Sequence, residues 1–77
     1  MPMNQPSTSQ KVMRARLIRE ARGETQLQVA LATGQHPSVI SRMERGKRPP
    51  GRDALLAIAR YYQVHPDRLL EEVGQGE

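Results

Sequence analysis

Hydrophobic residues recur three and four positions apart along most of the 77-residue chain, which is the period of an amphipathic helix. The first helix is expected to begin at a hydroxyl side chain between Ser7 and Ser9 and to end at Gly23. No run alternates with the period of two that indicates a strand. The sequence therefore predicts an all-α domain, a compact bundle of five short helices.

The remaining helices are marked by the residues at their ends. Thr25 and Gln28 have the spacing of a capping box, which places a second helix at residues 26–33, before a glycine. Pro37 suits the first turn of a third helix that ends near Arg45. A fourth helix with a wide apolar face is predicted over residues 52–62, and a fifth begins at Pro66 and carries Leu69, Leu70 and Val73.

The chain divides into a helical domain at residues 10–73, an N-terminal tail at 1–9 and a C-terminal tail at 74–77. The N-terminal tail has two Pro and no apolar period, so we expect it to be flexible. The absence of Cys excludes disulfides and thiolate metal sites. No apolar run approaches the ~18 residues of a membrane span and no secretion signal begins the chain, so we expect an unexported, cytoplasmic protein.

Positive charge is concentrated in two segments. Residues 11–22 and 36–52 each carry five Lys or Arg and one Glu, whereas residues 53–77 carry two bases and five acids. Basic segments of this kind are typical of a surface that binds nucleic acid, of one that binds an acidic membrane, or of an ordinary solvated surface. With two Tyr and no Phe or Trp, the chain lacks the stacking platforms of single-strand and RNA-binding modules. Duplex DNA is therefore the favoured polyanion.

The second and third predicted helices have the features of a helix-turn-helix. Ala30 allows two helices to cross closely, Gly34 permits the turn, and Val29, Ile40 and Met43 fill the angle between them. In such a motif the second helix enters the major groove of DNA.

Residues 15–70 resemble the lambda-repressor-like, Cro-type (XRE-family) helix-turn-helix regulators. The resemblance is carried by Leu17–Gly23, Thr25-Gln26, Val29-Ala30, Gly34, Ile40–Gly46, Pro50, Leu55–Ala59 and Val64–Leu70. It implies the lambda-repressor-like DNA-binding fold in a protein that a prokaryote or a phage encodes. Three residues depart from the family pattern. Glu24 replaces an apolar residue, which predicts a looser join between the first two helices, Gln35 replaces a common Val, and His36 replaces the usual Ser or Thr cap.

The third helix is expected to present one polar face to DNA. At 100° per residue, Ile40, Met43 and Glu44 share the inward face, and the opposite face presents Arg42, which suits the O6 and N7 acceptors of guanine. The resemblance implies that a set of residues approaches the bases, with Val39 touching a thymine methyl group: Pro37, Ser38, Val39, Ser41 and Arg42. A solvated polar face is the alternative interpretation.

A second set of residues is predicted to hold phosphates. The resemblance gives this role to Gln26 at the start of the second helix, where the helix dipole also favours an anion. The full set is Gln26, His36, Arg45, Lys47, Arg48 and Arg52. Capping alone is the alternative role of Gln26.

A charged residue on the inward face needs a partner, because burial of an unpaired carboxylate is costly. The resemblance implies a structural ion pair between Glu44 and Arg19. Leu27 and Leu31, one turn apart on the second helix, are expected to pack on the first helix, with binding of a partner as the alternative.

Neither catalysis nor metal binding is expected. His36 and His65 each precede a Pro at a helix start and have no second ligand at metal spacing. No set of nucleophile, base and acid is present, so the sequence predicts neither an enzyme nor a cofactor.

The sequence thus predicts a transcriptional regulator, a repressor, that binds a palindromic operator as a homodimer. The expected dimer surface contains Tyr61 or Tyr62 with Leu69, Leu70 and Val73. A protein-interaction module such as an antitoxin, whose tail binds a toxin, and a restriction-modification controller are the alternatives.

Overall fold

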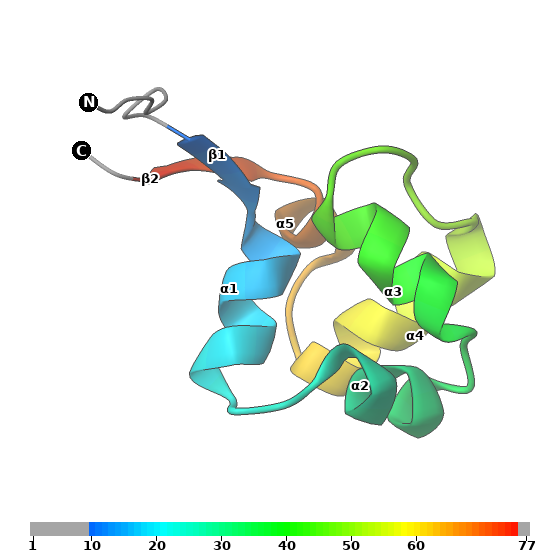
Figure 1. Ribbon diagram of the computed structural model, residues 1–77. Coiled ribbons are helices and arrows are strands. Elements are labelled where there is room, and N and C mark those ends of the chain that lie inside the picture. Colours follow the sequence, from blue (N-terminus) through cyan, green and yellow to red (C-terminus); the bar gives the residue numbers. More distant parts are fainter. Residues whose placement is uncertain (1–9, 76–77) are drawn as a thin grey trace.

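A computed structural model describes residues 10–75, which form five helices and a small two-stranded sheet (Figure 1). The helices are α1 (Arg14–Ala21), α2 (Gln26–Thr33), α3 (Pro37–Glu44), α4 (Arg52–Tyr62) and α5 (Pro66–Leu69), and the strands are β1 (Gln10–Met13) and β2 (Glu72–Gln75). The prediction of a five-helix domain is confirmed. Residues 1–9, expected to be a tail, lie outside the described residues.

The two strands were not predicted. They pair antiparallel, with Val12 opposite Val73, and extend from the helical body at one end of the molecule (Figure 1). Because β1 occupies residues 10–13, α1 begins at Arg14, so the predicted start between residues 7 and 9 is wrong. The fifth helix likewise ends before Val73, which lies in β2 together with Gly74.

Helix boundaries inside the domain agree with the predicted caps. The Thr25 hydroxyl accepts from the Gln28 backbone N–H at 3.0 Å, and the Gln28 side chain accepts from the Thr25 N–H at 2.8 Å, so the capping box is confirmed. Gly34 ends α2 with φ = 72°, a conformation that side chains with a Cβ rarely adopt. These two ends fix the length of α2 and the position of the turn.

The core lies between the helices and contains buried residues from all five of them. Its largest fully buried side chains are Ile40, Met43, Ile58, Leu69 and Val29. Leu69 is completely buried within the monomer, so its assignment to a dimer surface is wrong. Tyr61, Leu70 and Val73 are half-buried, whereas Tyr62 is buried.

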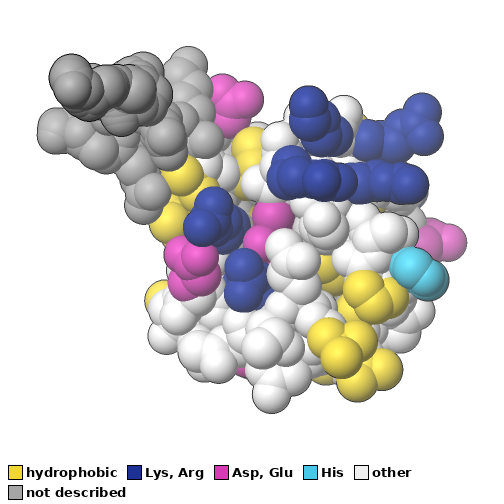
Figure 2. All heavy atoms as spheres, in the orientation of Figure 1, with side chains coloured by type: hydrophobic (Ala, Val, Ile, Leu, Met, Phe, Trp, Pro, Cys, Tyr) yellow, Lys and Arg dark blue, Asp and Glu magenta, His cyan; other side chains and the backbone are white. Residues whose placement is uncertain are grey.

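The expectation that Leu27 and Leu31 pack on the first helix is also wrong. Leu27 is 55% exposed and Leu31 is 74% exposed. Hydrophobic side chains accordingly gather on the surface over α2 (Figure 2). The opposite side of α2 buries Val29 and Ala30, and so the helix packs through one narrow stripe.

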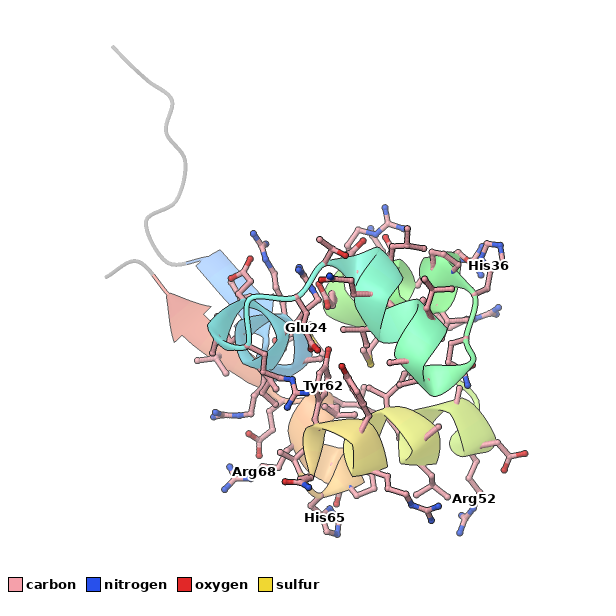
Figure 3. All side chains as sticks on the ribbon, turned by 90° about the horizontal axis from the view of Figure 1, so that it is seen from below. Glu24, His36, Arg52, Tyr62, His65 and Arg68 are labelled. Atoms are coloured by element: carbon pink, nitrogen blue, oxygen red, sulfur yellow. The ribbon has the colours of Figure 1, made fainter. Side chains whose placement is uncertain are left out.

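Glu24 strengthens the connection between α1 and α2, so the expectation of a looser connection is wrong. Its carboxylate accepts a hydrogen bond from Arg22 Nε at 2.9 Å and another from the Tyr61 hydroxyl of α4. The Arg22 guanidinium carbon also lies 4.8 Å from the centroid of the Tyr61 ring. The hydrogen bond from Arg22, followed by that from Tyr61, lowers the pKa of Glu24. Figure 3 shows Glu24 beside Tyr62, between α1 and α4.

Candidate nucleic-acid interface

The helix-turn-helix consists of α2, α3 and the short turn between them. Val29 and Ala30 of α2 and Ile40 of α3 are fully buried. After Gly34, the backbone N–H of Gln35 donates to the Ala30 carbonyl at 2.9 Å and closes the turn. The small side chain of Ala30 is thus placed where the helices approach each other, as predicted.

The two faces of α3 have opposite character. Ile40, Met43 and Glu44 are buried, which confirms the predicted inward face. All five predicted base-contacting residues are at least partly accessible. Pro37 and Arg42 are exposed, and Ser38, Val39 and Ser41 are half-buried. The helix is therefore held from one side and leaves its polar side free.

Basic side chains surround the accessible side of α3. We call Arg42, Arg45, Lys47 and Arg48 the basic surface, and all four are exposed. Figure 2 shows Lys and Arg side chains gathered over α3 and the loop that follows it. A shallow hollow of about 200 Å³ lies beside α3, with Arg42 and Arg48 on its walls and Val39 among its apolar lining residues.

The loop after α3 has a defined backbone path, which positions the basic surface. The N–H of Lys47 donates to the Arg42 carbonyl at 3.1 Å, and Gly46 takes a left-handed conformation at φ = 69°. Two prolines, Pro49 and Pro50, then lead to the start of α4. Arg52 begins α4 and is exposed, but its side chain points away from α2 and α3 (Figure 3).

The predicted ion pair between Arg19 and Glu44 is confirmed. Arg19 Nε donates to Glu44 Oε2 at 2.7 Å, and an Arg19 terminal nitrogen donates to Oε1 at 3.0 Å. The side chains are 13% and 2% exposed, so the pair is largely removed from water. The hydrogen bond to Glu44 raises the pKa of Arg19. Arg19 also donates to the Glu24 carbonyl at 2.8 Å and thereby holds the α1–α2 join.

Gln26 has a structural contact that the sequence did not predict. Its Nε2 donates to Glu44 Oε1 at 3.1 Å, so one carboxylate connects α1, α2 and α3. The Gln26 amide has a second N–H, which can still donate to a phosphate oxygen. The signal available in the sequence was a buried carboxylate, which can accept about four hydrogen bonds, more than the two that a bidentate arginine donates.

His36 caps the recognition helix in place of the Ser or Thr that is usual in the family. Its Nδ1 accepts the Ser38 backbone N–H at 3.1 Å. The residue is exposed, so its other ring nitrogen is accessible at the start of α3. His65 caps α5 in the same way, by accepting from the Asp67 N–H at 3.2 Å.

Within residues 10–75, no three His, Cys, Asp or Glu side chains are grouped as a metal site. In the same part of the chain, no helix has both the length and the hydropathy of a membrane span.

Comparison with known proteins identifies the family. A family model described as helix-turn-helix matches residues 16–69. Among solved structures, the restriction-modification controller protein C.AhdI from Aeromonas hydrophila is similar with a TM-score of 0.64 and 30% sequence identity, covering 73% of this chain and 85% of that chain. No curated protein sequence gives a match. The chain therefore belongs to the XRE-type helix-turn-helix family of DNA-binding transcription regulators.

Proposed function

We propose that this regulator recognises a specific duplex sequence with α3 in the major groove. The observation that carries the proposal is the division of α3 into a buried face and an accessible polar face bordered by the basic surface. An α-helix fits the major groove, and the residues at its N-terminal end approach the base edges.

Arg42 is the proposed guanine-reading residue. It is an exposed member of the basic surface, and a guanidinium can donate two hydrogen bonds to guanine O6 and N7. Pro37, Ser38 and Ser41 lie on the same helix and are proposed to contact neighbouring base edges. Val39 lines the hollow beside Arg42 and supplies an apolar contact for a thymine methyl group.

The phosphate contacts are proposed to come from residues around this face. Lys47 and Arg48 follow α3 in a fixed loop, and Arg45 is exposed at its end. Gln26 and His36 stand at the starts of α2 and α3, where helix dipoles favour anions. The orientation of Arg52 in Figure 3 makes it the weakest member of this set.

We further propose that two copies bind a palindromic operator and repress transcription by occupying it. One small module buries limited surface on DNA, and a symmetric pair doubles the contacts. Tyr61, Leu70 and Val73, which are half-buried in the monomer, are the proposed dimer surface. Sedimentation of the free protein and of its DNA complex tests this, and a monomer in both would contradict it.

Control of a restriction-modification system is a second candidate for the biological role. It is favoured by the similarity to C.AhdI, which is a restriction-modification controller protein. Genes for an endonuclease and a methyltransferase beside an operator bound by this protein would support it. A neighbouring toxin gene would instead favour an antitoxin.

Selection of bound duplexes from a random pool tests the proposed recognition, because it gives the motif, its symmetry and its spacing together. The Arg42→Ala variant should lose the preference for guanine at one position of each half-site. Arg68→Ala is the matched control, since Arg68 is an exposed arginine on α5, away from α3 (Figure 3). Retention of every base preference by Arg42→Ala would refute the role of Arg42.

A further inference from the structure

The Ser38 hydroxyl has a restricted hydrogen-bonding role because of His36. The Ser38 backbone N–H donates to His36 Nδ1 at 3.1 Å, and Ser38 Oγ lies 2.9 Å from the same nitrogen. A backbone N–H can only donate, so Nδ1 carries no proton and the neutral imidazole holds its proton on Nε2. At 2.9 Å the lone pairs of Oγ and Nδ1 would repel each other, which favours a Ser38 hydroxyl that donates to His36 and shares the single Nδ1 lone pair with the backbone N–H.

This arrangement removes the usual ambiguity of a serine at a DNA interface. A free serine hydroxyl can donate or accept and so suits any base edge. In Ser38 the contact with Nδ1 favours a hydroxyl hydrogen directed at His36, which leaves the lone pairs of Oγ for another partner. Ser38 is half-buried in the first turn of α3, the part of a recognition helix that approaches base edges.

In the major groove, the N4 amino group of cytosine and the N6 amino group of adenine donate, whereas guanine O6 and N7, thymine O4 and adenine N7 accept. We propose that His36 is a positioning residue that makes Ser38 an acceptor, so that Ser38 selects cytosine or adenine at one position of each half-site. The inference rests on the proposed function, because it requires α3 to lie in the major groove.

The chain contains a matched control for this arrangement. His65 caps α5 through its Nδ1, as His36 caps α3, and the residue two positions later is Asp67. Figure 3 shows His65 and His36 on opposite sides of the molecule. Removal of either imidazole thus removes the same type of cap, but only His36 contacts a residue of the recognition helix.

The experiment compares duplex selection by the wild type with selection by Ser38→Ala, His36→Gly and His65→Gly, because glycine is tolerated at a helix N-cap. Ser38→Ala identifies the operator position that Ser38 contacts. There the wild type should prefer cytosine or adenine by about 2- to 12-fold, the range of one hydrogen bond. In His36→Gly the hydroxyl is free to rotate, so the preference should fall to within about twofold. In His65→Gly the wild-type preference for cytosine or adenine should persist.

A conservative replacement separates hydroxyl orientation from stability. The Asn oxygen in His36→Asn can accept both Ser38 hydrogens, so this variant should keep the preference for cytosine or adenine. A wild-type preference for guanine or thymine at the Ser38 position would overturn the inference. An unchanged preference in a His36→Gly variant that melts as a folded domain would also overturn it. Failure of the wild type to bind any duplex at low salt would instead overturn the proposed function, and this inference with it.

Discussion

Replacement of Glu44 by Gln tests whether the buried carboxylate holds the recognition helix in place. Glu44 accepts two hydrogen bonds from Arg19 and one from Gln26, and its side chain is 2% exposed. The variant keeps the volume of the side chain but leaves the Arg19 guanidinium without its counter-charge. Loss of one partner from a buried ion pair costs about 3–5 kcal/mol.

This loss is large for a domain of 77 residues, whose free energy of unfolding is expected to be about 5–15 kcal/mol. In domains of this size, each kcal/mol lowers the melting temperature by roughly 4–8 °C, so Glu44→Gln should melt roughly 12–40 °C below the wild type. Urea unfolding followed by circular dichroism gives the free energy, and thermal melting gives the temperature.

The exposed pair between Arg16 and Glu20 provides the control. Its side chains are 52% and 47% exposed, so Glu20→Gln should cost no more than about 1 kcal/mol. A double variant that replaces Arg19 by Met and Glu44 by Leu should be more stable than either single variant, because no unpaired charge is then buried. Equal losses of unfolding free energy for Glu44→Gln and Glu20→Gln would refute the stabilising role of the buried carboxylate.

Three further outcomes follow from the structure. Lys47→Ala should weaken binding to all duplexes alike and reduce the slope of log affinity against log salt concentration by about one unit. A loss of affinity confined to one DNA sequence would count against a phosphate contact. The pKa of Glu24 in the folded protein lies below its ordinary 4.5. The ionised carboxylate therefore stabilises the fold above pH 4.5, and this contribution is lost as the pH falls through the pKa of the folded state. Urea titrations at several pH values should therefore show a smaller acid loss in Glu24→Gln than in the wild type, and parallel curves would contradict this. Gly34→Ala should cost about 1–2 kcal/mol from its positive φ alone, since an added Cβ meets no atom within 4 Å; an unchanged urea midpoint would disprove it.

The helices and the inward face of α3 were predictable because their signals are local. The capping box at Thr25, the glycine after α2 and the proline at the start of α3 each determine a boundary through contacts within four residues. Ile40 and Met43 follow the helical period, so their burial could be read from spacing alone. The pairing of Arg19 with Glu44 required the family resemblance, because 25 positions separate the two residues.

The two strands could not be predicted because their pairing is not local. Each has only four residues, in which apolar and polar positions do not alternate strictly, and register depends on contacts between opposite ends of the described chain. The exposure of Leu31 was missed for a related reason. Spacing gives the faces of α2, but only the positions of the neighbouring helices decide how much of each face is covered.

The carboxylate of Glu44 explains why an acid occurs within a basic DNA-binding segment. It faces away from the accessible side of α3 and is neutralised by Arg19, so it does not reduce the positive charge that the basic surface presents. Because it also accepts from Gln26, the start of α2 and the end of α3 are fixed by the same group. A recognition helix held by this network and by the burial of Ile40 and Met43 is already ordered before it contacts DNA. Binding then incurs little of the entropy cost of ordering the helix, and more of the contact energy contributes to affinity than if the helix had to fold on DNA.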